Sequence, residues 1–199
     1  MTLRLYLASA SPRRSQLLDQ IRVAHEILPV DLDERRLPNE PPADYVKRLA
    51  AAKARTLWER LPERDRQPVL GADTTVALGD QIFGKPVDRV DGLAMLRRLA
   101  GGTHQVLTAV ALQSSQGCST RLSVSDVTFA PLSDEECTAY WETDEPLGKA
   151  GGYAIQGLAA TFITRIVGSY SGIMGLPLAE TAELLRGIGW RLDGERNDR

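Results

Sequence analysis

The sequence predicts an α/β protein in which strand-like and helical segments alternate along 199 residues. Two observations favour this class. A short apolar run at residues 3–7 leads through a tight loop into a helical pattern, and longer apolar runs typical of strands follow at residues 69–78, 104–112 and 119–129. With 43% hydrophobic residues, the chain can bury one sizeable core in a single domain with room for two lobes.

Charge and cysteine content argue against several classes of protein. The net charge of -2 disfavours a nucleic-acid binder with a broad basic face, so any bound anion must meet a local cluster of cations. No apolar run reaches the length of a membrane span, and Arg4 interrupts the first one, so we expect a cytoplasmic protein without a signal peptide. Cys118 and Cys137 lack CxxC spacing, and only His25 and His104 accompany them, which disfavours a disulfide framework and a zinc site.

The first strand-to-helix turn gathers polar side chains that suit an anion. Ser11 stands at the expected N-cap and Pro12 at the first helical position. Free backbone N–H groups, the hydroxyls of Ser9 and Ser11 and the guanidinium groups of Arg13 and Arg14 together predict a cradle for a phosphate chain. A capped helix with two solvated arginines is the alternative, and this motif alone does not decide between the two.

A charged loop follows the second expected strand, at residues 25–30. It contains the acidic pair Asp33 and Glu34 and ends at Pro38. Most charge runs are only solvated, but an acidic pair directly after a strand is also a position from which a carboxylate can reach a metal. Glu34 is therefore a candidate site residue.

The helix that begins near residue 43 carries a lysine, Lys53, within its apolar stripe. The stripe consists of Val46, Leu49, Ala50, Leu57 and Leu61. The lysine is therefore expected to face inward. Either its ammonium extends past the core to water, or it meets an anion in a cleft beneath the helix, since a desolvated ammonium is costly without a partner.

The strand at residues 69–78 contains one carboxylate, Asp73. An aspartate rarely goes unpaired in an apolar strand. Gly71 and Thr75, its neighbours on the same face, are expected to leave room beside it, so we favour a metal-binding or general-base role over a structural one. A tight turn then returns the chain to Lys85, which is expected to come back toward Asp73; a lone surface lysine is the alternative.

The remaining elements are expected to be mainly framework. They are a helix through residues 93–99, a long hairpin of strands 104–112 and 119–129 with the polar loop 113–118, a short helix after the capping box of Ser133 and Glu136, a strand at 161–167 and a helix at 178–186. His104 is expected to be a hydrogen-bonded structural histidine. The glycine-rich stretch at 148–157 lets backbone approach a ligand, and Gln156 in it can read a base edge through its amide; this signal is weak on its own.

Six motifs occur in order between residues 3 and 190: Ser-Ala-Ser-Pro-Arg-Arg at 9–14, Asp-Glu at 33–34, Leu-Ala-Ala-Ala-Lys-Ala at 49–54, Gly-Ala-Asp-Thr at 71–74, Gly-Lys-Pro at 84–86 and Tyr-Ala-Ile-Gln-Gly at 153–157. Together they resemble the Maf-like nucleotide pyrophosphatases. The resemblance implies a mixed twisted sheet with flanking helices and two lobes around a central cleft, similar to the inosine triphosphate pyrophosphatases, in a homodimer. We expect one such domain over residues 1–192 and a polar tail at 193–199.

The resemblance also implies hydrolysis of a nucleoside triphosphate between the α and β phosphates, with a divalent metal, Mg²⁺ or Mn²⁺. Asp73 corresponds to the proton acceptor, Glu34, Lys53 and Lys85 to the other polar residues of the cleft, and the two carboxylates to the metal ligands. The positions matched to substrate contacts are Ser9, Ser11, Arg13, Arg14, Thr74 and Gln156. The Ile-Gln-Gly form resembles the branch that acts on dTTP and UTP; the branch that prefers 7-methyl-GTP typically has an acidic residue in place of this glutamine.

The charges of the motif residues agree with a triphosphate substrate. A triphosphate carries about four negative charges, and the motifs supply four cations and two carboxylates, which can divide metal binding and water activation between them in either order. A regulatory protein linked to cell division that binds nucleotides without hydrolysing them is the alternative; cations alone would suffice for it, so the carboxylates favour the enzyme. A P-loop NTPase or a kinase is disfavoured because neither glycine motif occurs.

Overall fold

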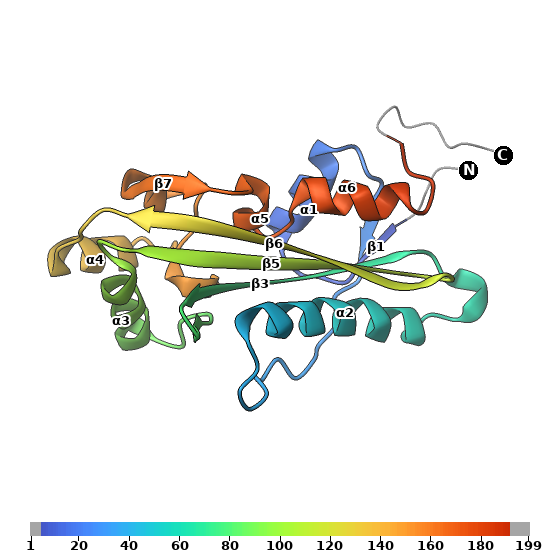
Figure 1. Ribbon diagram of the computed structural model, residues 1–199, viewed down its shortest axis with the longest axis horizontal. Coiled ribbons are helices and arrows are strands. Elements are labelled where there is room, and N and C mark those ends of the chain that lie inside the picture. Colours follow the sequence, from blue (N-terminus) through green and yellow to red (C-terminus); the bar gives the residue numbers. More distant parts are fainter. Residues whose placement is uncertain (1–4, 192–199) are drawn as a thin grey trace.

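The computed structural model describes residues 5–191, which form one seven-stranded sheet covered by helices on both faces (Figure 1). The strands are β1 (Leu5–Leu7), β2 (His25–Ile27), β3 (Val69–Leu78), β4 (Gln81–Phe83), β5 (Thr103–Ser114), β6 (Gly117–Phe129) and β7 (Ile163–Val167). Their order is β2-β1-β3-β5-β6-β7, and β4 pairs with β3 off this path. β1 runs parallel to β2 and β3, and the other pairs are antiparallel. The sheet is therefore mixed, as predicted.

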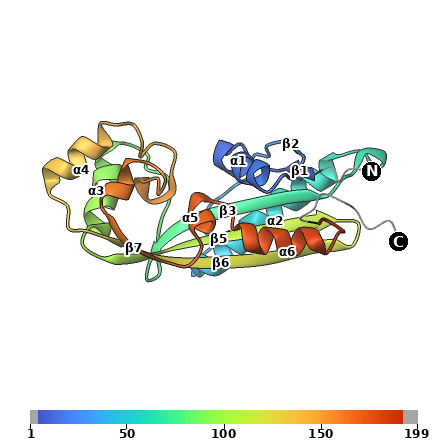
Figure 2. The same ribbon diagram turned by 90° about the horizontal axis from the view of Figure 1, so that it is seen from above.

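The helices are α1 (Pro12–Gln20), α2 (Pro42–Arg60), α3 (Arg89–Leu99), α4 (Asp134–Trp141), α5 (Tyr170–Met174) and α6 (Leu178–Arg186), with short 3₁₀ turns η1 (Glu63–Asp65), η2 (Ala150–Gly152) and η3 (Leu158–Thr161). α2 lies along one face of the sheet and α6 along the other (Figure 1). Figure 2 shows α3 and α4 at one end of the long strands and α1 with β1 and β2 away from that end. We call the part formed by α3, α4, η2 and η3 the α3 end.

Apolar side chains form three clusters that correspond to these layers. The first joins the α3 end to the sheet and includes Phe129 and Tyr153; the second lies under α1 and α6, and the third under α2. α2 forms where the apolar periodicity predicted a helix. Its buried residues recur at helical spacing along a single stripe that packs against the sheet.

Two expectations about elements were wrong, and one short helix was missed. The polar segment 113–118 is mostly strand, because Ser114 pairs directly with Gly117 and only two residues form the turn. Polar residues can extend a hairpin when their side chains are exposed, so polarity was misread as a loop. β2 ends at Ile27 instead of residue 30, close to Pro29, which has no N–H for a further ladder bond. The short helix α5 was not predicted.

His104 is a buried, structural histidine, as predicted. Its side chain is packed edge-on against Phe129, with ring centroids 4.8 Å apart, and its Nε2 lies 2.8 Å from the hydroxyl of Tyr153. Burial lowers the pKa of His104 to about 4. The capping box of Ser133 and Glu136 at the start of α4 is also confirmed.

The predicted polar tail at residues 193–199 lies outside the described residues. Within residues 5–191, no helix combines the length and the apolar character that crossing a membrane requires.

Candidate active site

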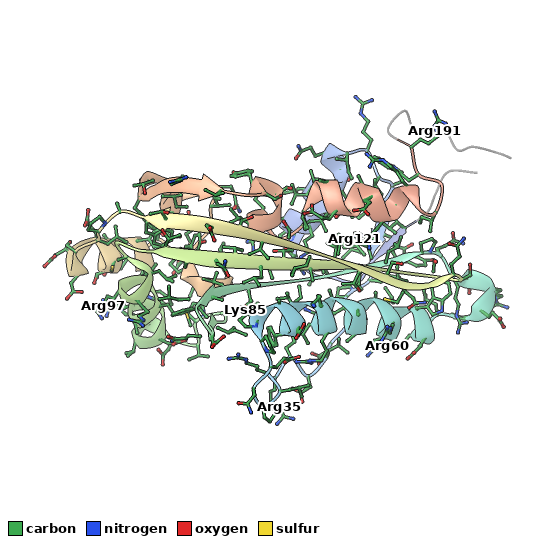
Figure 3. All side chains as sticks on the ribbon, viewed as in Figure 1. Arg35, Arg60, Lys85, Arg97, Arg121 and Arg191 are labelled. Carbon is green, nitrogen blue, oxygen red and sulfur yellow. The ribbon has the colours of Figure 1, made fainter. Side chains whose placement is uncertain are left out.

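A cleft of about 640 Å³ lies between the α1 turn and the α3 end. All the predicted site residues line it: Ser9, Ser11, Arg13, Arg14, Glu34, Lys53, Asp73, Thr74, Lys85 and Gln156. Figure 3 places Lys85 near the middle of the molecule, between α3 and the start of α2. The fold thus brings the six motifs together, while the role of each residue stays a prediction.

The cleft opens at a break in the pairing of β3. The ladder with β1 ends at Leu70, and the ladder with β4 begins at Val76, so the five residues between them form an edge of the sheet. Successive strand residues point to opposite faces. At this edge Asp73 therefore faces α2 and the adjacent Thr74 faces α1, and both side chains line the same cleft.

Lys53 is held between two carboxylates. Its Nζ lies 2.7 Å from Oδ1 of Asp73 and 2.6 Å from Oε1 of Glu34. Lys53 and Asp73 are buried, with 8% and 7% of their surfaces exposed. The interpretation of Lys53 as an inward lysine with an anionic partner is confirmed, and the alternative in which its ammonium reaches bulk water is wrong.

Gly71 allows α2 to approach β3 closely enough for this contact. A Cβ atom at Gly71 would overlap the carbonyl oxygen of Ala50 and lie 2.8 Å from the backbone nitrogen of Ala54. The expectation that Gly71 leaves open room beside Asp73 was wrong, because the backbone of α2 fills that space. The missing side chain instead sets the distance between the helix that carries Lys53 and the strand that carries Asp73.

The two carboxylates have opposite pKa shifts. Burial raises the pKa of Asp73, and the positive charges of Lys53 and Arg14 offset this only in part. Burial also raises the pKa of Glu34, but the hydrogen bond and the charge of Lys53 outweigh it and lower the pKa below its ordinary value. The Glu34 side chain is 44% exposed, so it loses less hydration. Asp73 is therefore the stronger base of the pair.

The loop that carries Glu34 is fixed by residues of α2. The hydroxyl of Tyr45 donates to the backbone carbonyl of Glu34 at 3.0 Å. Arg48 donates from Nε and Nη2 to both carboxylate oxygens of Glu40, at 2.6 and 2.7 Å, and Glu40 is only 8% exposed. Sequence reasoning missed this support, because nothing in the local pattern around Glu40 indicates its partner Arg48. Asp33 pairs instead with the exposed Arg35.

Arg14 is bound by protein groups on three sides. It donates from Nε to the carbonyl of Gly175 at 2.8 Å, from Nη1 to Oγ of Ser9 at 2.9 Å and from Nη2 to Oγ1 of Thr74 at 3.2 Å. The alternative of two solvated arginines is thus wrong for Arg14. Ser11 occupies the N-cap position of α1, but its side chain makes no capping hydrogen bond, so its predicted capping role is wrong.

Within residues 5–191, three cations line the cleft without an ion-pair partner: Arg13, Lys85 and Lys149. Arg13 makes one hydrogen bond, from Nε to the carbonyl of Met174 at 3.3 Å, and Lys149 donates to the carbonyl of Leu147 at 3.3 Å. Burial, and then the charge of Arg13, lower the pKa of Lys149. Lys149 was not singled out from the sequence, although this lysine lies within the glycine-rich stretch at residues 148–157.

The donor set suits a metal that binds together with the substrate. The described part of the chain contains no group of three or more His, Cys, Asp or Glu side chains that could hold a metal ion. Glu34 and Asp73 do provide two carboxylates at one point of the cleft. Mg²⁺ in nucleotide enzymes is commonly held by one or two carboxylates and the substrate phosphates, so these residues fit such an ion.

The chain matches the model of a known protein family. The family model described as "Maf-like protein" matches residues 4–188. The chain belongs to the Maf-like family. Among relatives of this Maf-like chain, the dTTP/UTP pyrophosphatase of Hahella chejuensis is 49% identical over 189 residues and covers 95% of this chain and 94% of its own. That of Albidiferax ferrireducens is 51% identical over 196 residues, with 94% and 98% covered.

Solved structures confirm the fold class. The Ham1 protein of Staphylococcus aureus superposes with a TM-score of 0.52 at 9% identity, covering 97% of the Maf-like chain and all of its own. At this identity the likeness concerns the fold alone. The predicted α/β architecture with a mixed sheet and flanking helices is confirmed by this match and by the strand order.

Proposed function

We propose that this Maf-like protein hydrolyses dTTP and UTP between the α and β phosphates to the nucleoside monophosphate and pyrophosphate. The observation that carries the proposal is the contact of Lys53 with Asp73 and Glu34 in a cleft that unpaired cations also line. Relatives about half identical over nearly the whole chain are named dTTP/UTP pyrophosphatases, which supports the choice of substrate.

Asp73 acts as the proton acceptor in the proposed reaction. A water oxygen attacks the α phosphorus, its proton passes to the Asp73 carboxylate, and the bond from the α phosphorus to the bridging oxygen breaks as pyrophosphate leaves. The raised pKa of Asp73 suits a general base, and Lys53 fixes the carboxylate through its 2.7 Å contact. Arg13, Lys85 and Lys149 stabilise the charge on the phosphates.

Glu34 and Asp73 are the residues that would hold Mg²⁺ or Mn²⁺. Such an ion would neutralise charge that develops on the phosphates. Glu34 stays ionised to lower pH than Asp73 because its pKa is lowered, which favours metal binding by Glu34 and proton transfer by Asp73. This division of roles is one that the sequence left open.

Gln156 recognises the base in this proposal. A uracil or thymine ring presents a carbonyl, an imide N–H and a second carbonyl, and a carboxamide can pair with a donor and an acceptor at once. Gln156 is exposed and lines the cleft, so it can make these bonds. Resemblance to the family further supports a cytoplasmic homodimer, and a role in removing or regulating nucleotides.

The test is a panel of nucleoside triphosphates with Mg²⁺, assayed for pyrophosphate and orthophosphate separately. We expect UTP and dTTP to give pyrophosphate, chelation to abolish the reaction, and Asp73→Asn to lower kcat by at least ~10². Orthophosphate as the first product would refute cleavage between the α and β phosphates. Tight nucleotide binding without turnover would favour the alternative, a regulatory nucleotide-binding protein.

A further inference from the structure

The segment that carries Gln156 is anchored by one carboxylate from the loop between α4 and η2. Glu145 accepts hydrogen bonds from the backbone N–H of Leu158 at 2.7 Å, from that of Ala159 at 3.2 Å and from the hydroxyl of Tyr140 at 2.8 Å. Oε2 takes the first bond, and Oε1 takes the other two. The segment immediately after Gln156 is therefore held by a residue that does not belong to it.

The segment before Gln156 is tied to the same group. The hydroxyl of Tyr140 accepts a hydrogen bond from the backbone N–H of Ala154 at 3.3 Å while it donates to Glu145. Tyr140 and Glu145 thus hold the chain two residues before Gln156 and two residues after it. Within residues 5–191, Gln156 itself has no side-chain hydrogen bond, so these backbone contacts fix the point from which its side chain enters the cleft.

Gly157 shows how closely the carboxylate is packed against this segment. A Cβ atom at Gly157 would overlap both oxygens of Glu145. Burial raises the pKa of Glu145, but the hydrogen bonds from Leu158 and Tyr140 outweigh it and lower the pKa below its ordinary value. The side chain is thus an ionised, acceptor-only group, as its three donors require.

We propose that Glu145 positions Gln156 and thereby sets the base selectivity of the cleft. The inference rests on the proposed function, because it takes Gln156 as the residue that reads the base. Glu145 is a positioning residue and touches no substrate. A hydrogen bond to a base edge weakens steeply with distance and angle, so a small displacement of the segment changes discrimination between bases and leaves contacts to the phosphates intact.

Glu145→Gln tests this with little change in shape. The amide keeps one acceptor and places N–H donors against a backbone N–H or the Tyr140 hydroxyl, so the three bonds cannot all persist. We expect the ratio of kcat/KM for UTP to that for GTP to fall by about tenfold. Inhibition by inorganic tripolyphosphate, which has no base, should change by less than about twofold. Glu142→Gln, an exposed glutamate close by in the sequence, is the matched control and should leave both values unchanged.

The Gln156→Ala background separates positioning from general support of the fold. In that background, Glu145→Gln should cause no further loss of selectivity, because the group it orients is absent. Persistent loss of selectivity there, or an equal fall in kcat/KM for all nucleotides with weaker tripolyphosphate inhibition, would overturn the proposal and make Glu145 a framework residue. If Glu145→Gln does not fold, Tyr140→Phe, which removes the link to Ala154, must reduce selectivity in the same direction.

Failure of the proposed function would be recognised separately. If the parent protein hydrolyses no nucleotide, the same variants are compared by calorimetric binding of UMP, GMP and tripolyphosphate. Loss of UMP preference in Glu145→Gln with unchanged tripolyphosphate binding would still support the inference, and an unchanged preference would refute it.

Discussion

Replacing Lys53 with methionine should destabilise the protein in a strongly pH-dependent way. Methionine keeps the apolar stem and deletes the charge that lies 2.7 Å from Asp73. Asp73 is only 7% exposed, so the variant leaves a buried carboxylate without its nearest cation. Removing one partner of a buried ion pair is far more costly than removing an exposed one, because the remaining charge has lost its hydration.

Protonation of Asp73 limits the size of this loss. From an ordinary pKa of 3.8, protonating the carboxyl at pH 7 costs about 4 kcal/mol, at about 1.4 kcal/mol per pH unit. The free energy of unfolding should therefore fall by at most about 4 kcal/mol at pH 7. The loss is smaller to the extent that the charge of Arg14 stabilises the Asp73 carboxylate in the variant. The folded-state pKa of Asp73 in the variant lies above the unfolded value, so the loss is largest at high pH and shrinks as the pH falls toward 4.

Urea unfolding at pH 5, 6, 7 and 8 measures this dependence. Lys47→Met is the matched control, because Lys47 forms an exposed pair with Asp44 at 2.7 Å, and it should cost less than about 1 kcal/mol at every pH. The double variant Lys53→Met with Asp73→Asn should recover most of the loss, since position 73 then carries no buried negative charge. A Lys53→Met variant within about 0.5 kcal/mol of the parent from pH 5 to pH 8 would refute the reasoning.

Three other predictions follow from particular contacts. Gln156→Glu should lower kcat/KM for UTP and dTTP by about 10- to 100-fold relative to 7-methyl-GTP, because a carboxylate would face a ring carbonyl; equal losses on all three would mean that Gln156 only positions the triphosphate. His104, with its pKa lowered to about 4, is neutral when folded, so it stabilises the protein fully above pH 6.5 and this contribution is lost as the pH falls toward 4. When the pH falls from 7 to 5, the free energy of unfolding should decrease by about 2 kcal/mol more in the parent than in the His104→Gln variant. An equal decrease in the two proteins would count against a neutral buried histidine. Gly71→Ala should cost about 1–3 kcal/mol and lower kcat, since α2 must shift away from β3; unfolding and kinetics unchanged from the parent would contradict this.

Periodic and strongly apolar segments could be predicted closely from the sequence. β3 and α6 have the predicted ends, and Lys53 lies on the buried stripe of α2 as its spacing indicated. These features depend on local pattern, which the sequence contains. The β5–β6 turn was misplaced because half-buried polar residues such as Ser114 are compatible with both loop and strand.

The residues that line the cleft were easier to predict than their contacts. Lys53, Asp73 and Glu34 each had a local signal, but their shared contact depends on the packing of α2 on β3 and on the path of an irregular loop. Glu40 and Glu145 had no signal at all, because their roles depend on hydrogen-bond partners that only the folded chain brings near. Long-range support of this kind is set by tertiary structure and leaves no periodicity in the sequence.

The structure also changes which cations are available to a triphosphate. Arg14 donates hydrogen bonds to three protein acceptors, and Lys53 forms ion pairs with two carboxylates. The charges of both cations are therefore already partnered by groups of the protein. In the described part of the chain, Arg13, Lys85 and Lys149 line the cleft without an ion-pair partner. Because burial lowers the pKa of Arg13 and contributes to the lowered pKa of Lys149, an arriving polyanion would relieve an existing electrostatic cost at both groups. Under the proposed function, the charge that meets the phosphates therefore comes from residues that the fold leaves unneutralised, while Lys53 and Arg14 hold Asp73 and the edge of β3 in place.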